Sequence, residues 1–220
     1  MKVTNNSEYI YTKIKELILS GYFKENEKIN QASLAKKFNV SRTPVVKTLY
    51  RLTSEGIIEN IPNKGFYLVK FSLDELVDLL KIRQAFDKVL AESLIQTVTD
   101  EQINHMKNMF IPFQNCIWDE VVTSNYWDTD KEFHEYLLEI CPNKWVKRID
   151  DNFHIYGKVY HGGLIRTPIV TLPEHLNIIN AIEEKNFEKT TYELSQHIQA
   201  SIDVLENTIK TLDGFGYSNK

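Results

Sequence analysis

The order of short structural patterns in residues 8–69 constrains the fold more than any other feature of the chain. Three helical patterns come first, each with apolar residues at helical spacing, and they cover Glu8–Ser20, Gln31–Phe38 and Ser41–Glu55. Two β-rich runs follow, Ile57–Ile61 and Phe66–Val69. The Pro-Asn-Lys-Gly sequence between the two runs is typical of a β-hairpin. Three short helices followed by a two-stranded ribbon predict a winged helix-turn-helix.

The remainder of the chain is predicted to be all helical. Ser72-Leu73-Asp74-Glu75 forms a capping box that opens a long helix to about Gln96. Further helical patterns cover Asp100–Cys116, Asp119–Ile140, Asn143–Tyr160, Pro173–Glu184 and Phe187–Thr211. We therefore predict a mainly α chain of two domains: a winged helix-turn-helix with a short β-hairpin in residues 1–71, and an all-α helical bundle in residues 72–220.

The charged residues are unevenly divided between these two parts. Residues 1–70 contain 12 Lys and Arg against 6 Asp and Glu, whereas residues 71–220 contain 14 against 24, and the whole chain carries a net charge of −4. A basic module on an acidic body indicates that the first part binds a polyanion such as double-stranded DNA. The alternative is chance segregation of surface charge.

The composition also indicates the cellular compartment of the protein. No stretch approaches the ~20 consecutive apolar residues of a membrane span, and the N-terminus has no apolar signal core. Cys116 and Cys141 stand in no metal-binding or redox spacing, which is typical of reduced thiols in the cytosol. We expect a cytoplasmic protein with no membrane partner.

The second and third helical patterns indicate which residues would contact DNA. A recognition helix places its N-terminal residues against base edges or phosphates, where its free N–H groups favour an anion. Arg42 can donate two hydrogen bonds to a guanine or a phosphate. The glycine at the hairpin tip allows a close backbone approach to a groove. The predicted DNA-contacting residues are Ser41, Arg42, Thr43, Pro44, Lys47, Arg51, Lys64 and Gly65. For each charged side chain the alternative is a solvated surface residue.

The run LAKKFNVSRTPVVKTLYRLTSEGIIENIPNKGF carries a specific resemblance. Residues 9–69 resemble the winged helix module of the GntR family, in which the SRTPV motif begins the recognition helix. One departure is Val46, where the family usually has an arginine that often touches DNA, so the base preference is expected to differ. Lys47 could supply the lost charge, although it points about 100° away around the helix. The resemblance implies a bacterial transcriptional regulator that binds a pseudo-palindromic operator as a homodimer.

Four side chains in the second part form a candidate metal site. Asp130 and His134 are four residues apart and share a helical face, and His175 and His197 stand in two later helices. One carboxylate and three imidazoles suit a divalent cation such as Zn, Ni or Mn. The alternative is one exposed carboxylate with three scattered histidines.

Residues 73–212 resemble the FCD effector domain of the FadR-like branch of GntR regulators. The matching pieces are LVDLLKIRQAFDKVLAE, DKEFHEYLLEICPNKW, EHLNIINAIEEKNFEKT and QHIQASI. In many members an Asp-x3-His pair and two later histidines hold a metal, and these positions map onto the four residues above. The six predicted helices indicate the VanR-like subgroup.

The FCD resemblance also implies an effector. The family's arginine that often pairs with an acidic ligand maps onto Arg83, for which the alternative is a salt bridge to Asp87. The implied function is a repressor that binds a metal and a small organic acid. Alternatives are a regulator that senses the metal itself, a fatty-acyl sensor without metal and a metal-dependent hydrolase, for which the sequence shows no general base at a recognisable spacing.

Overall fold

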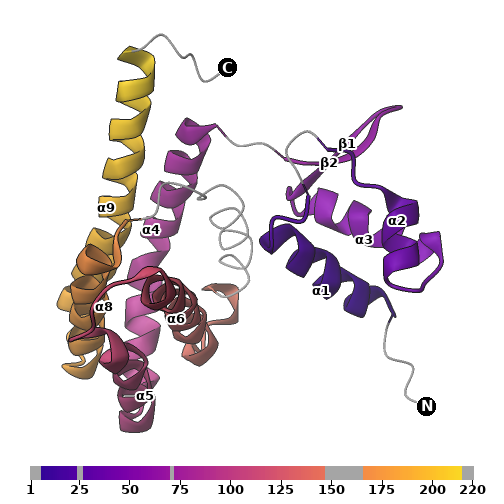
Figure 1. Cartoon of the computed structure of the whole chain (residues 1–220). Helices are drawn as coiled ribbons and strands as arrows, with labels where there is room; N and C mark the ends of the chain where they lie inside the picture. Colours follow the sequence, from indigo (N-terminus) through magenta and orange to yellow (C-terminus); the bar gives the residue numbers. More distant parts are fainter. Residues whose placement is uncertain (1–5, 24–26, 70–71, 147–165, 215–220) are drawn as a thin grey trace. The chain divides into compact units, whose positions relative to one another are not determined.

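The structure is a computed structural model, and it describes residues 6–23, 27–69, 72–146 and 166–214. Among these residues the chain divides into two compact units, one of residues 6–69 and one of residues 72–146 and 166–214 (Figure 1). The predicted helix Asn143–Tyr160 falls mostly outside the described residues: only residues 144–146 of it are assigned as helix. The predicted number of helices in the second unit therefore stays a prediction.

The first unit has the elements of a winged helix-turn-helix, in the predicted order. These are α1 (Asn6–Leu19), α2 (Gln31–Lys37), α3 (Arg42–Ser54), β1 (Ile58–Ile61) and β2 (Gly65–Leu68). Apolar residues spaced three or four apart on α1 and α3 face each other, and Ile10, Ile14, Leu49 and Leu52 are fully buried between them. The resulting core is small, and it holds the outer face of α3 toward solvent.

Local hydrogen bonds fix where α2 and the ribbon begin and end. The Asn30 side chain accepts hydrogen bonds from the backbone N–H groups of Ala32 and Ser33, which caps α2. The strands β1 and β2 pair antiparallel, with Ile58 opposite Leu68 and Ile61 opposite Gly65. The two-stranded ribbon is therefore confirmed.

The second unit is a bundle of helices. Its described elements are α4 (Leu73–Thr97), α5 (Asp100–Phe110), the 3-10 turn η1 (Ile111–Phe113), α6 (Glu120–Ile140), α8 (Pro168–Glu183) and α9 (Phe187–Gly214). The long helices α4 and α9 run side by side in opposite directions (Figure 1), and the Gln84 side chain donates to the Ser195 carbonyl oxygen between them. The helix α8 packs on α9 and α5. The capping box at Ser72 and Glu75 is present at the start of α4, as predicted.

Proline positions account for the two largest boundary errors in the prediction. The helix predicted through Cys116 ends as α5 at Phe110, because Pro112 lacks the N–H that would continue the ladder and a 3-10 turn follows. The helix predicted to begin at Pro173 begins instead at Pro168, and Pro173 lies inside it. Pro168 takes the first helical position, where a missing N–H costs nothing, whereas Pro173 lies in the second turn and removes one backbone hydrogen bond.

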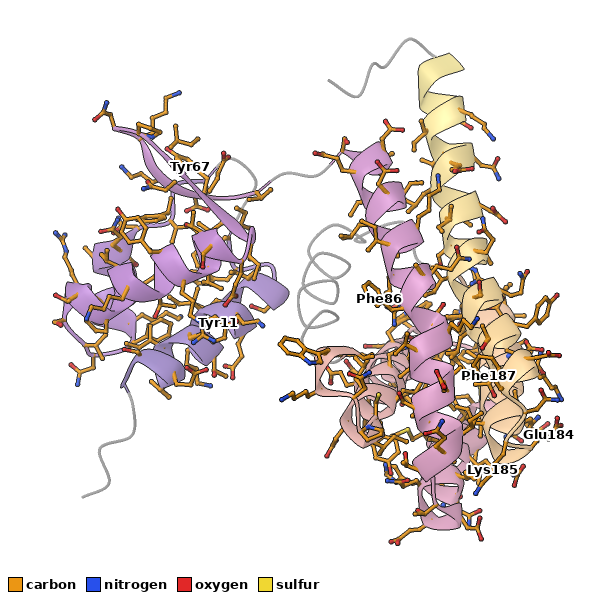
Figure 2. All side chains as sticks on the ribbon, turned by 180° about the vertical axis from the view of Figure 1, so that it is seen from behind. Tyr11, Tyr67, Phe86, Glu184, Lys185 and Phe187 are labelled. Atoms are coloured by element: carbon orange, nitrogen blue, oxygen red, sulfur yellow. The ribbon has the colours of Figure 1, made fainter. Side chains whose placement is uncertain are left out.

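The turn between α8 and α9 is short. Lys185 takes a φ of 49°, in the left-handed region, and its N–H donates to the Ile182 carbonyl oxygen at 3.0 Å. Figure 2 shows Glu184 and Lys185 at this end of the bundle. The turn brings α9 back along α8, so that the middle of each helix faces the same core. Within the described residues, no helix combines the length and apolar character that a bilayer crossing requires.

Candidate nucleic-acid interface and candidate metal centre

The outer face of α3 is a polar stripe opposite its buried side. The exposed or largely exposed residues on this stripe are Thr43, Lys47, Tyr50 and Ser54. Their spacing of three or four residues keeps them on one face of the helix. Tyr50 is 55% exposed, and its ring meets Phe66 of the ribbon edge-on at 5.1 Å between centroids. The sequence prediction missed Tyr50, although its spacing from Thr43 and Lys47 would have placed it on this face.

The start of α3 is suited to an anion. Ser41 is the N-cap residue in extended conformation, and its hydroxyl makes no capping hydrogen bond. Ser41, Arg42 and Thr43 are all exposed. The first backbone N–H groups of an α-helix lack partners within the helix, so an incoming phosphate would meet these donors, the Ser41 hydroxyl and the Arg42 guanidinium together. Pro44 is half-buried in the first turn.

The ribbon tip holds a second set of predicted residues. Lys64 is exposed, and Gly65 takes a φ of +112°, which side-chain-bearing residues rarely adopt. A Cβ added at Gly65 would lie 2.7 Å from Cε of Lys28, so the Lys28 side chain runs directly over the glycine. Next to it, the N–H of Ile29 donates to the Phe66 carbonyl oxygen at 2.8 Å. Lys28 is thus a second exposed cation beside the ribbon tip that the sequence did not reveal.

Arg51 has partners inside the first unit. Its guanidinium lies 2.8 Å from a Glu8 carboxylate oxygen and 3.1 Å from a Glu55 carboxylate oxygen. It also covers the Tyr11 ring at 3.6 Å from the centroid, a cation–π geometry; Figure 2 labels Tyr11. These contacts join α3 to α1. The contact of Arg51 with DNA stays a prediction, and the structure supplies a competing role in holding the two helices together.

In the second unit, the four predicted metal ligands converge. Asp130 and His134 lie on α6, His175 on α8 and His197 on α9. The three histidines each offer a ring nitrogen, and these nitrogens lie within 4.8 Å of one another. The rings of His175 and His197 are 4.7 Å apart between centroids. Three helices distant in sequence therefore direct nitrogen donors to one point.

Asp130 faces two of the histidines. Its carboxylate oxygens lie 3.8 Å from Nε2 of His134 and 3.6 Å from Nε2 of His175. Burial raises the pKa of Asp130 to about 7, and the positive charges of Arg83 and Arg166 oppose that rise. Both guanidinium groups are therefore close enough to act on the cluster electrostatically.

His175 is the most enclosed member of the cluster. Its side chain is fully buried and stacks on Phe110 at 5.1 Å between centroids. Nδ1 lies 3.0 Å from the Tyr126 hydroxyl, whereas the buried Nε2 has no hydrogen-bond partner among the described residues. Burial, assisted by His197 and Arg166, lowers the pKa of His175 well below its ordinary value. The ring is neutral at physiological pH and keeps a nitrogen lone pair available to a metal.

His197 and Glu174 form a close pair at the edge of the cluster. Burial lowers the pKa of His197, and the neighbouring Glu174 carboxylate opposes that shift. Burial by itself raises the pKa of Glu174, but hydrogen bonds with His197 and Arg166 outweigh it and leave the pKa below the ordinary value. The carboxylate is consequently ionised at neutral pH. Glu174 and Arg166 were not predicted from the sequence.

The donor set fits a borderline divalent metal. A tetrahedral zinc site with bonds of about 2.0–2.1 Å places its ligand atoms roughly 3.4 Å apart, so nitrogens that lie within 4.8 Å of one another need to approach by at most about 1.4 Å. A buried imidazole nitrogen without a partner is costly unless something binds it, and a metal would remove that cost. Arg83 is half-buried on α4, and its contact with a ligand stays a prediction.

The raised pKa of Asp130 predicts proton release on metal binding. A metal binds the carboxylate form, so the proton must leave. With a pKa of about 7 in the metal-free protein, Asp130 is mostly protonated at pH 6 and mostly ionised at pH 8. Zinc binding should release about one proton at pH 6 and close to none at pH 8, as measured by calorimetry in buffers of different ionisation enthalpy. Equal release at both values would contradict the assignment of Asp130 as a ligand.

The raised pKa of Asp130 also determines how the stability of the metal-free chain changes with pH. The folded, metal-free chain binds the Asp130 proton more tightly than the unfolded chain does. This difference stabilises the folded state fully below the unfolded pKa, and the stabilisation is lost as pH rises through the folded pKa of about 7. Added metal is therefore expected to stabilise the chain most above that pH.

Comparison with known proteins assigns both units. Residues 6–68 match the family described as bacterial regulatory proteins, gntR family, and residues 78–200 match the FCD domain. The chain belongs to the GntR family of transcriptional regulators. The FCD match alone covers more than half of its residues. A GntR regulator binds DNA through its helix-turn-helix, and the assignment removes the hydrolase alternative because the family and the related proteins are regulators.

Related proteins extend over nearly the whole chain. The HTH-type transcriptional regulator YdhC of Bacillus subtilis is 23% identical over 204 residues, covering 91% of each chain. The Nta operon transcriptional regulator of Aminobacter aminovorans is 24% identical and covers 88% of this chain and 91% of its own. The transcriptional repressor RspR of Escherichia coli is 23% identical and covers 88% and 86%.

Solved structures share the fold. Escherichia coli McbR/YncC superposes with a TM-score of 0.74 at 15% identity, covering 92% of this chain and 97% of that one. A GntR regulator from Rhodococcus sp. RHA1 gives a TM-score of 0.71 at 14% identity, covering 92% and 99%. At these identities the likeness concerns the fold alone.

Proposed function

We propose that this GntR regulator is a repressor whose FCD domain holds a divalent metal and responds to a small carboxylate. The convergence of His134, His175 and His197 from three helices carries the proposal, together with Asp130 beside two of them and the buried Nε2 of His175. One related protein, RspR, is a transcriptional repressor, which supports repression rather than activation. The proposal includes the predicted division of the chain into a DNA-binding domain of residues 1–71 and an effector domain of residues 72–220.

The residues of the FCD domain suggest how a carboxylate would be recognised. A bound metal would supply a Lewis-acid centre with open positions for an oxygen ligand. The chain itself supplies the positive charge of Arg83, which acts on Asp130 and His197 and would attract an anion toward the cluster. The neutral state of the deeply buried His175 avoids a competing positive charge in the core.

At the other end of the chain, we propose that a homodimer places two α3 helices in successive major grooves of a pseudo-palindromic operator. Half-sites then lie about one helical turn apart, roughly 34 Å. The proposed contacts are Ser41, Arg42, Thr43, Pro44, Lys47, Lys64 and Gly65, with Arg51 as a further candidate. A ligand alters DNA binding only by the difference in its affinity for the two states of the dimer, typically ~1–3 kcal/mol or roughly 5–150-fold.

One titration tests this proposal. The full-length chain, in its metal-free and its zinc-loaded form, is titrated with its own promoter fragment at fixed salt, with and without a panel of small mono- and dicarboxylic acids. We expect at least one acid to weaken DNA binding by roughly 5–150-fold, and Arg83→Ala to reduce that response. The matched control is Lys81→Ala, which removes an exposed cation from the same helix.

The same titration has two outcomes that overturn the carboxylate sensor. If zinc alone changes DNA affinity and no acid does, the metal itself is the signal. If neither zinc nor any acid changes DNA affinity, the FCD domain does not regulate DNA binding through this site.

A further inference from the structure

The hydrogen bonds behind His197 determine which of its nitrogens faces the cluster. Nδ1 of His197 lies 2.7 Å from Oε2 of Glu174, and both side chains are mostly buried. Because an ionised carboxylate only accepts hydrogen bonds, Nδ1 must carry the proton. Nε2 is then the unprotonated nitrogen, which is the form a metal binds.

Glu174 is itself held in place. Its other carboxylate oxygen, Oε1, pairs with Nη2 of Arg166, whose side chain is only 8% exposed. Nη1 of the same guanidinium donates to the backbone carbonyl oxygen of His197 at 3.1 Å. Arg166, Glu174 and His197 therefore form a closed triangle that joins the start of α8, its second turn and α9. A carboxylate fixed on both oxygens has little freedom to turn away from the imidazole.

We propose that Glu174 is a positioning residue for His197: it fixes the imidazole with Nε2 toward the cluster and makes that nitrogen a stronger donor. Arg166 positions Glu174 in turn. A carboxylate behind a metal-bound histidine sets its tautomer and raises its basicity. The inference rests on the metal site of the proposed function, but the hydrogen bond and tautomer exist without a metal.

The contrast with His175 makes the role of Glu174 specific. The corresponding partner of His175 is a neutral phenol: Nδ1 of His175 lies 3.0 Å from the Tyr126 hydroxyl. That hydroxyl also lies 2.7 Å from the Thr171 hydroxyl. Two histidines of one cluster thus have partners of different charge. His197 is expected to be the more electron-rich ligand.

Two measurements on the full-length chain test the role of Glu174. In the metal-free protein, nitrogen-15 NMR of labelled histidine should show His197 as the Nδ1–H tautomer, and Glu174→Ala should convert it to a mixture. Competition with a chromophoric chelator should show zinc binding 10- to 100-fold weaker in Glu174→Ala. Glu174→Gln should keep the tautomer, since an amide oxygen can accept from Nδ1–H, and bind zinc with intermediate affinity. Glu188→Ala, which removes an exposed glutamate from α9, should match the wild type.

The outcomes that overturn the inference are distinct from those that overturn the metal site. If Glu174→Ala keeps both the wild-type tautomer and the wild-type zinc affinity, Glu174 does not position His197. If that variant does not fold, unchanged zinc affinity in Glu174→Gln would show that the carboxylate charge does not strengthen His197 as a donor. A wild-type chain that binds no zinc refutes the metal site, whereas its His197 tautomer still reports on the hydrogen bond.

Discussion

Replacing His175 with alanine is expected to remove the metal-dependent part of the stability of the chain. A ligand that binds only the folded state stabilises it by ~2.7 kcal/mol at 100 times its dissociation constant and ~4.1 kcal/mol at 1,000 times. For a chain of this size, each kcal/mol corresponds to about 2–4 °C. Zinc at those concentrations should therefore raise the Tm of the wild type by about 5–16 °C, and that of His175→Ala by close to zero.

The measurement is thermal unfolding with and without zinc, compared within each variant. The comparison must be internal, because removing a buried ring that stacks on Phe110 also leaves a cavity that lowers the Tm by itself. His105→Ala is the matched control, since His105 is an exposed histidine on α5 outside the cluster. A full zinc-dependent shift in His175→Ala would show that this ring is not a ligand.

Replacing Arg42 with alanine is expected to weaken operator binding by ~1–3 kcal/mol, because an exposed arginine at the start of α3 can donate two hydrogen bonds to one base. Lys47→Ala should behave differently: its loss lowers affinity for all sequences alike and reduces the slope of log K against log salt by about 0.9. Fluorescence anisotropy on operator and scrambled fragments over a salt series measures both effects.

The salt series also decides between the two roles of Arg51. If Arg51 serves to join α3 to α1 through Glu8, Glu55 and Tyr11, Arg51→Ala lowers the Tm and leaves the salt slope unchanged. Lys189→Ala is the control, because it removes a cation paired with Glu184 in the other unit.

For the Arg42 prediction, unchanged operator affinity in Arg42→Ala would show that Arg42 does not contact the operator.

Spacing rules in the sequence were sufficient to predict most of the helices and strands and to place Asp130 and His134 on one helical face, whereas His175 and His197 joined the candidate metal site through the resemblance to the FCD domain. Apolar periodicity located α1 and α3, and the four-residue spacing of Asp130 and His134 placed both on one face of α6. The ends of helices were predicted less well. The pattern around Pro173 predicts a helix start there, although the helix begins at Pro168 and its first residues Pro168, Thr171 and Leu172 are buried.

The parts that the sequence could not reveal depend on contacts between distant segments. Arg166 meets His197 only because the chain folds back from α8 to α9, and no spacing rule connects Arg166 with Glu174 and His197. Lys28 reaches the ribbon tip because the segment before α2 bonds to Phe66. The competing role of Arg51 was hidden because its partners Glu8 and Tyr11 lie on another helix.

We propose that the FCD domain of this chain holds a metal through Asp130 and three histidines. Native mass spectrometry with elemental analysis of the purified full-length protein would detect this metal without any assumption about its identity. We predict one divalent ion, Zn, Ni or Mn, per chain, retained in His105→Ala and lost in His197→Ala. A wild-type chain that carries no metal as purified, and takes up none when zinc, nickel or manganese is added, would contradict the claim.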